Sequence, residues 1–152
     1  MKTLARSRDR LEIQRRLKHV RADARARWGR MSAHQMICHL ADSLRMAIGD
    51  KAVAPDTSPF KTTILKWIVL YVPAPWPPGI LTSPEIDQEQ GGTRPGTFAA
   101  DVLETERYLA LVSADETSLD DRPHPLFGRM SRAAWLRWSY LHTDHHLRQF
   151  GA

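Results

Sequence analysis

Cysteine is almost absent from this chain of 152 residues, because Cys38 is its only one. A single cysteine excludes an internal disulfide and a cysteine-based zinc site. The first ten residues, MKTLARSRDR, carry charge but no apolar segment follows them, so we expect no secretory signal. Both absences favour a cytoplasmic protein.

Long hydrophobic runs are also missing. The longest extends from Ile64 to Pro75, is interrupted by Lys66 and is closed by prolines. Because a bilayer-spanning helix needs about 20 residues, we expect no membrane span and interpret this run as a buried helix. Internal repeats and domain boundaries are missing too, so residues 1–152 are expected to form a single domain.

Positive charge is concentrated at the start of the chain. Residues 1–30 contain 11 Lys and Arg against 3 Asp and Glu, whereas the remainder contains 11 against 14. A basic segment can attract nucleic acid or an anionic surface, but no zinc-finger or RNP-type pattern accompanies these arginines. A solvated helix face is the preferred interpretation, and nucleic-acid binding through the first helix is the weakest functional alternative.

Apolar residues recur at helical spacing in several segments. The most clearly bounded helix starts at Ser32, which forms a capping-box pattern with Gln35, and stops at Gly49. Residues 59–71 are also predicted to be a helix. Because this segment is rich in β-branched residues, a buried strand is the minor alternative. The other predicted helices cover roughly residues 6–27, ended by Gly29, then 97–113, and 132–149, capped by Ser131 and followed by Gly151.

A long proline-rich connection separates the third and fourth predicted helices. It contains Pro73, Pro75, Pro77, Pro78 and Pro84, which forbid continuous helix, and a turn at Gly91-Gly92. Such a connection is typical of a crossover between non-adjacent helices or of a lid over a pocket. Residues 113–130, SADETSLDDRPHPLFGRM, are predicted to be a loop. Four main helices with one long crossover predict an all-α fold, a four-helix bundle.

Three of the seven histidines stand together in LHTDHHLRQFG near the end of the chain. On a helix at about 100° per residue, His142 and His146 lie about 40° apart, on the face that carries Trp135. Two imidazoles on adjacent turns of one face can share a metal ion. His145 lies at the edge of this face and is predicted to flank the site, whereas Asp144 is predicted to point to solvent.

A third metal ligand must come from another helix. His39 is the best candidate, because it lies at the edge of an apolar stripe and a buried imidazole without a partner is costly. His34 and Cys38 lie about 140° and about 100° from His39 around the same helix, so neither is expected to share the site. His124 lies in a predicted loop as a capping or pocket residue, and His19 is expected to be exposed.

Two polar residues are predicted to orient the ligands through hydrogen bonds. Gln149 lies one turn beyond His146 on the same face, and Asp42 lies one turn from His39. For Asp42, a solvated position is the alternative. The tryptophans are interpreted as core residues or as walls of a substrate pocket: Trp67, Trp76, Trp135 and Trp138.

The segment MSAHQMICHLADSL, the proline-containing connection and the ending HTDHHLRQFG resemble the DinB-like (DinB/YfiT) family of metalloenzymes, within a branch of unknown function. The similarity extends from about Trp28 to Gly151. It implies a four-helix bundle in up-down-down-up order, with a divalent metal held by one histidine of the second helix and two of the last. In this chain those histidines are His39, His142 and His146.

The resemblance implies a divalent-metal-dependent enzyme acting on a small molecule, as a thiol-dependent S-transferase or a hydrolase. Members of the family use low-molecular-weight thiols such as mycothiol, bacillithiol or glutathione, and many are homodimers. Three neutral imidazoles leave positions open on Zn²⁺ or Ni²⁺, where a water or thiol can lose its proton at neutral pH. The alternative is a non-catalytic metal-binding or sensing protein, in which the same histidines are structural.

Overall fold

Helices make up most of the chain in a computed structural model that describes residues 1–79 and 82–152. The expectation of a mainly helical protein is confirmed, but a small antiparallel sheet modifies the all-α class. The α-helices of the described residues are α1 (Ser7–His19), α2 (Ala33–Ile48), α3 (Lys66–Tyr71), α4 (Phe98–Ser113) and α5 (Arg132–Gln149). The shorter elements are the π-helical turn η1 (Lys61–Leu65), the 3-10 turn η2 (Pro84–Ile86), and the strands β1 (Arg122–His124) and β2 (Gly128–Met130).

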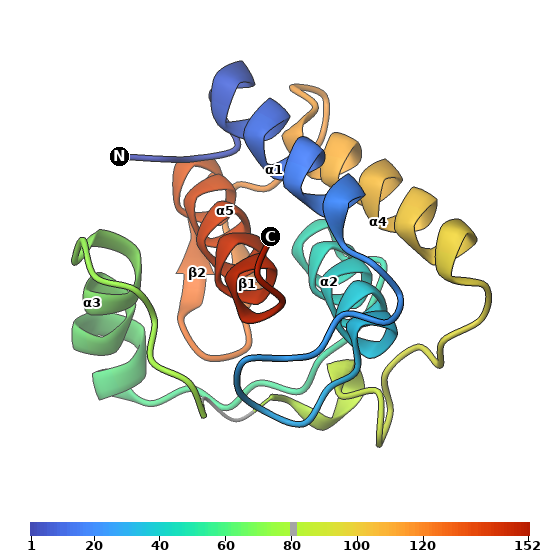
Figure 1. Cartoon of the computed structure of the whole chain (residues 1–152). Helices are drawn as coiled ribbons and strands as arrows, with labels where there is room; N and C mark the ends of the chain where they lie inside the picture. Colours follow the sequence, from blue (N-terminus) through green and yellow to red (C-terminus); the bar gives the residue numbers. More distant parts are fainter. Residues whose placement is uncertain (80–81) are drawn as a thin grey trace.

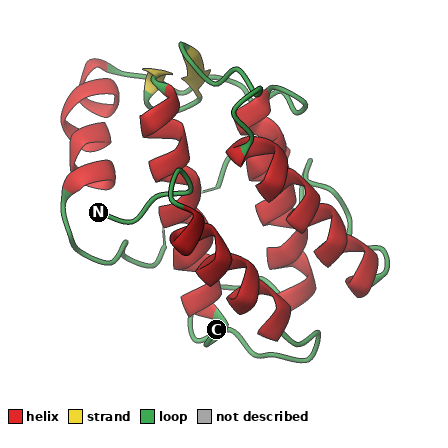
Figure 2. Ribbon diagram, turned by 90° about the horizontal axis from the view of Figure 1, so that it is seen from above, coloured by secondary structure: helices red, strands yellow, loops and turns green. Residues whose placement is uncertain are grey.

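The helix α5 lies in the middle of the molecule (Figure 1). It contacts α1 and α2 on one side and α3 on the other, and α4 packs along α2 and against α1. Figure 2 shows α3 standing apart from the remaining helices, with the two strands close to one end of α5. The two helices that carry most of the candidate ligands, α2 and α5, are therefore direct neighbours.

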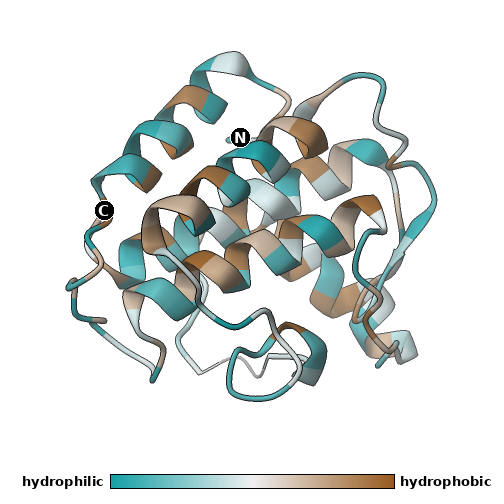
Figure 3. Cartoon of the chain, turned by 90° about the vertical axis from the view of Figure 1, so that its right-hand side faces the viewer, coloured by the Kyte–Doolittle hydropathy of each residue, from teal (hydrophilic) through white to brown (hydrophobic). Residues whose placement is uncertain are grey.

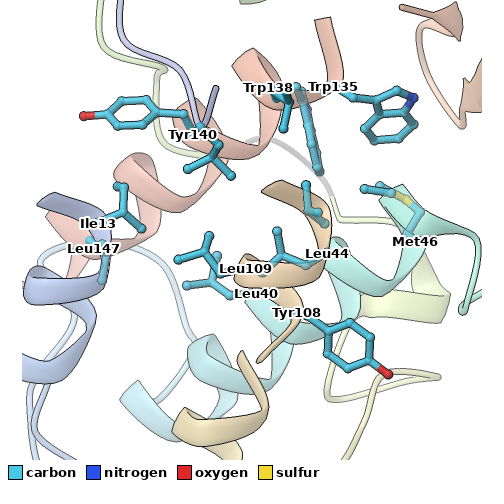
Figure 4. Close-up of a cluster of buried hydrophobic side chains, with 14 of the residues drawn as sticks. Ile13, Leu40, Leu44, Met46, Tyr108, Leu109, Trp135, Trp138, Tyr140 and Leu147 are labelled. Carbon is cyan, nitrogen blue, oxygen red and sulfur yellow. The ribbon is translucent and has the colours of Figure 1, made fainter. Parts of the chain in front are cut away.

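The core fills the space between α1, α2, α4 and α5. Hydrophobic and hydrophilic residues alternate along the helices (Figure 3), which gives each an apolar stripe to bury. Burying one such leucine or isoleucine contributes roughly 1.5–3 kcal/mol to stability. Figure 4 shows side chains from the four helices meeting there, among them the fully buried Ile13, Leu40, Leu44, Leu109, Trp135 and Leu147.

Both predicted ends of α2 are confirmed. Ser32 Oγ accepts a hydrogen bond from the Gln35 N–H at 3.1 Å, and Gln35 Oε1 accepts one from the Ser32 N–H at 2.8 Å. Gly49 has φ +87°, the left-handed conformation that ends helices at little cost to glycine. These caps fix where α2 begins and ends, and its buried faces fix its rotation.

The first helix is shorter than predicted. It was expected over residues 6–27 with Gly29 at its end, but α1 ends at His19, because Val20 adopts an extended backbone with ψ 126°. The apolar spacing continues beyond this point, but Ala24 and Trp28 belong to a loop that follows α1. The spacing alone could not distinguish these two arrangements. His19 is exposed, as expected.

Residues 59–71 are helical, but the prediction of a buried helix is wrong. Trp67 is 60% exposed and Ile64 is 55% exposed, and within α3 only Leu70 is buried. The hydrophobic run has no second layer to cover it, because α3 lies at the side of α5. No helix among residues 1–79 and 82–152 has the combined length and hydropathy of a membrane span.

The predicted loop over residues 113–130 contains a small hairpin. β1 and β2 pair antiparallel, with Arg122 opposite Met130 and His124 opposite Gly128. Each strand has three residues, too few for an alternating pattern to identify them. The hairpin leads into α5, whose first turn is capped as predicted: Ser131 Oγ accepts from the Ala134 N–H at 3.3 Å.

The exposed face of α3 leads to a stability prediction. Trp67→Ser should change the free energy of unfolding by less than about 0.5 kcal/mol, as for other surface substitutions. Leu70→Ala lies on the buried side of the same helix and should cost about 2–4 kcal/mol, because it leaves a cavity in the core. Urea unfolding followed by far-ultraviolet circular dichroism measures both. Equal losses for the two variants would contradict the observed orientation of α3.

Candidate metal centre

Three imidazole rings from two helices converge in the structure. His39 comes from α2, and His142 and His146 come from successive turns of α5. Their ring centroids are 4.7–5.0 Å apart, and the Nε2 atoms of His39 and His142 are 3.2 Å apart. One ring nitrogen of each residue lies within 4.8 Å of the other two, so the cluster could hold a metal ion.

The tautomer of His39 is fixed by a backbone carbonyl. His39 Nδ1 lies 2.8 Å from the carbonyl oxygen of Ile86, to which it can only donate. A neutral His39 therefore carries its proton on Nδ1, and the lone pair on Nε2 faces the other two rings. Ile86 belongs to η2 in the proline-rich crossover, which places this segment beside the centre.

Gln149 lies next to His146, as its position one turn further along the same face predicts. Its Oε1 is 2.8 Å from His146 Nδ1, and its Nε2 donates to the carbonyl oxygen of Trp28 at 2.7 Å. The second contact fixes which end of the amide faces the imidazole. His146 therefore donates from Nδ1 and, like His39, keeps its Nε2 lone pair for the centre.

The loop between α1 and α2 holds Gln149 in place. The Arg27 N–H donates to the Gln149 carbonyl at 2.8 Å, and the Trp28 carbonyl accepts from the side-chain amide. Gly29 has φ +78°, and a Cβ there would lie only 2.7 Å from Gln149 Nε2. A residue other than glycine would thus push against the group that orients His146.

The prediction that Asp42 orients His39 by a hydrogen bond is wrong. It does not hydrogen-bond His39, and it is fully buried, so the solvated alternative is wrong as well. Its carboxylate accepts from the backbone N–H and hydroxyl of Thr93, both at 2.7 Å, and from Gln88 Nε2 at 3.2 Å. Lys51 Nζ lies 3.1 Å away. Asp42 therefore anchors the crossover segment that contains the Ile86 carbonyl, and its charge partly opposes the lowering of the His39 pKa by burial.

His145 flanks the centre, as predicted from its angle on the helix. Its ring packs against Trp28 and Trp76, with centroids 5.6 Å and 6.0 Å away, and against His146 at 5.1 Å. His145 Nδ1 is buried and has no hydrogen-bond partner among the described residues. It does not orient a ligand by a hydrogen bond, but it places a polar atom next to the three-histidine cluster.

Tryptophans enclose one side of the cluster. Trp138 stacks on His142 with a centroid distance of 4.7 Å and an interplanar angle of 10°, and Trp76 lies 6.2 Å from the same ring. Trp76 Nε1 donates to the carbonyl oxygen of Val69, near the end of α3. Trp135 is entirely buried in the core, and Trp67 is exposed on α3.

The three rings are held in their neutral form. Burial lowers the pKa of His39, and it lowers the pKa values of His142 and His146 well below the usual range, with neighbouring imidazoles adding to the shift. Neutral imidazole is the form that binds a metal ion. The donor set thus fits a divalent ion of the zinc or nickel type.

The prediction that Asp144 points to solvent is also wrong. Its carboxylate pairs with Arg16 Nη1 at 2.6 Å and with Arg148 Nε at 3.0 Å, and its side chain is 20% exposed. Arg16 belongs to α1, so this pair joins α1 to the last turns of α5. Helical angle alone could not show that α1 covers that side.

His34 and Cys38 lie outside the three-histidine cluster, as expected. They form a separate group with Asp101 of α4: His34 Nε2 is 2.6 Å and Cys38 Sγ is 3.6 Å from Asp101 Oδ2. Burial, with a smaller effect of Asp101, raises the pKa of the Cys38 thiol to about 12. The spacing of His34 and Cys38 was visible in the sequence, but their partner on α4 was not.

His124 is a buried residue of the hairpin. Its Nδ1 accepts a hydrogen bond from the Leu126 N–H at 3.1 Å, and its ring stacks on Phe127 at 4.5 Å. Trp135 and Trp138 pack on its other sides. Desolvation lowers the pKa of His124 to about 3. It is thus a capping and core residue and not a ligand of the cluster.

Comparison with known proteins gives one match. A family model described as protein of unknown function (DUF1569) matches residues 6–152. Neither curated proteins nor solved structures give a match.

His124 leads to a prediction about acid stability. Between pH 6.5 and about pH 3, His124 binds a proton in the unfolded chain but stays neutral in the folded chain. The free energy of unfolding therefore decreases as the pH falls through this window. Each such proton contributes a slope of about 1.4 kcal/mol per pH unit. His124→Asn, which keeps an acceptor for Leu126, should lose up to one proton of this slope in urea unfolding with a chelator present.

Phe127→Leu is the matched control for this measurement. It disturbs the same ring stack without removing a titratable group, so it should lower stability equally at each pH and keep the wild-type slope. An unchanged slope in His124→Asn would show that His124 is not held neutral.

Proposed function

The chain belongs to the DUF1569 family, and we propose that it is a divalent-metal-dependent enzyme whose ion is held by His39, His142 and His146. The observation that carries this proposal is the meeting of three neutral imidazoles, two of which are oriented from behind through Nδ1. A neutral imidazole has one donor and one acceptor, and in these two rings the Nδ1 contact uses the donor, which leaves the Nε2 acceptor for an ion. Orientation of the ring by a second hydrogen bond is typical of metal ligands.

The proposed architecture is DinB-like. The helices α1, α2, α4 and α5 form a four-helix bundle in up-down-down-up order, with residues 72–97 as the crossover. Support comes from the single core that these helices share and from the direct contact of α2 with α5. Homodimerisation and the cytoplasmic location remain expectations from the resemblance and the composition.

Three protein ligands leave room for a further one. A divalent ion in this centre supplies Lewis acidity, which lowers the pKa of a water or thiol that coordinates it. Such chemistry suits a hydrolase or a thiol-dependent S-transferase. His142 is the ligand with exposed surface, so an incoming small molecule would approach from its side.

The side chains beside the three-histidine cluster supply a binding surface. Trp76 is partly exposed beside His142, and the apolar part of a substrate can pack against its ring. The Ile86 carbonyl and Gln149 fix the orientation of the His39 and His146 rings while a substrate binds.

Metal uptake tests the centre directly. Purified wild-type protein, loaded with Zn²⁺ or Ni²⁺ and dialysed, should retain the ion, and His146→Gln should weaken its binding by more than about 100-fold, beyond the range for groups that only orient a ligand. His145→Gln, one residue away, is the matched control and should stay within about tenfold. Elemental analysis and competition with a chromophoric chelator measure both effects. If the wild type retains no stoichiometric ion under any loading condition, the enzyme proposal fails.

A second measurement separates an enzyme from a protein that only binds metal. The Cys38→Ser variant is used for this test, because it removes the thiol of the separate group with His34 and Asp101 that could also hold a metal ion. Loaded with Co²⁺, this variant should change its visible spectrum when azide or 2-mercaptoethanol is added, because either can occupy an open coordination position. The same variant with His142→Ala added should not respond in this way. A cobalt spectrum that ignores both additives would mean a closed, structural centre and would favour the non-catalytic alternative.

A further inference from the structure

A second set of metal-binding side chains lies between α2 and α4. His34 and Cys38 stand one turn apart on α2, and Asp101 faces them from the first turn of α4. One ligand atom of each lies within 4.8 Å of the other two. We call these three residues the α2–α4 cluster. Cys38 and His39 are adjacent in sequence but about 100° apart around the helix, so the two clusters use different faces of α2.

The chemistry of the α2–α4 cluster suits a borderline-soft divalent cation. It combines an imidazole nitrogen, a sulfur and a carboxylate oxygen, all of which bind Zn²⁺. Zinc–ligand bonds of about 2.0–2.3 Å require donor atoms about 3–4 Å apart. The cluster spans 2.6 Å from His34 Nε2 to Asp101 Oδ2 and 3.6 Å from Cys38 Sγ to the same oxygen. Small side-chain adjustments bring it into this range.

The cluster is held by contacts outside it. The Gly96 N–H donates to Asp101 Oδ2 at 2.9 Å, and Phe98 packs edge-on against the His34 ring at 5.3 Å. Thr105 Oγ1 contacts the carbonyl oxygens of both Ile37 and Asp101, at 3.1 Å and 2.8 Å, and so ties α2 to α4 at this level. Two independent helices thus present their ligands at a fixed separation.

An ion can reach this position from solvent. The side chains of His34 and Asp101 are 22% and 23% exposed, whereas Cys38 is buried beneath them. The thiol forms the floor and the other two ligands form the rim. The open side leaves a fourth coordination position for water, as in sites with three protein ligands.

We propose that His34, Cys38 and Asp101 form a second divalent-metal site, which takes Zn²⁺ or another thiophilic ion independently of the three-histidine centre. Binding replaces the Cys38 S–H bond by a sulfur–metal bond, and the proton leaves to solvent. The hydrogen bond between His34 and Asp101 opens at the same time. A neutral His34 moves its proton through solvent from Nε2, where it bonded Asp101, to Nδ1, and then ligates through Nε2.

Cobalt titration tests this site by a signal that only sulfur gives. Fully reduced wild-type protein should bind two Co²⁺ per chain and develop a near-ultraviolet thiolate-to-cobalt charge-transfer band, which Zn²⁺ abolishes by displacement. Cys38→Ser should lose the band and one ion. Asp101→Asn, nearly isosteric, should keep the band with at least tenfold weaker binding. His146→Gln should keep the band and lose only the other ion.

These outcomes keep the two proposals apart. Absence of the His146-dependent ion alone would end the three-histidine centre, whereas absence of the charge-transfer band alone would end the second site. If saturating Co²⁺ gives no such band in wild-type protein whose thiol is shown to be free, the α2–α4 cluster is a hydrogen-bonded link between helices and not a metal site. That result depends on the wild type only, so a variant that fails to fold does not affect it.

Discussion

The rotation of α2 about its own axis is the constraint on which both clusters depend. This helix is buried against α5 on one side and α4 on another, and its apolar stripe leaves little freedom to turn. One side directs His39 towards α5, and another directs His34 and Cys38 towards Asp101. Rotating α2 about its axis by the equivalent of one residue, about 100°, would separate the ligands of both clusters. The packing of the core thus determines the chemistry that the surface of the helix can offer.

The three-histidine cluster is completed by backbone groups from distant parts of the chain. The Ile86 carbonyl orients His39, and the Trp28 carbonyl orients Gln149 and through it His146. Neither segment is an α-helix, and each is fastened separately: the first by the buried carboxylate of Asp42 and the second by the close approach at Gly29. The three rings are carried by the helices α2 and α5. The tautomers of His39 and His146 are set by contacts that start from connecting segments.

Periodicity made part of this predictable. The ends of α2, the extents of α4 and α5, and the shared face of His142 and His146 follow from local sequence, since a helix converts spacing into direction. What failed depended on tertiary neighbours. Asp42 bonds Thr93 and not His39, and Asp144 pairs with Arg16 of α1. One face of α3 is exposed, although its sequence is hydrophobic. The hairpin at His124 was too short to leave a pattern, and the pairing of α2 with Asp101 is invisible without knowing which helices adjoin.

The hydrogen bond from Trp76 to Val69 couples two parts of the molecule that differ in anchorage. Through it, Trp76, which lies beside His142 and His145 of α5, is hydrogen-bonded to α3, a helix with a single buried residue. The walls of the centre are therefore mechanically unequal. Trp138 is buried in the core, whereas Trp76 is tied to a peripheral helix that is held by the packing of Leu70 and by the hydrogen bond from Arg137 Nε to the Leu70 carbonyl oxygen at 2.8 Å.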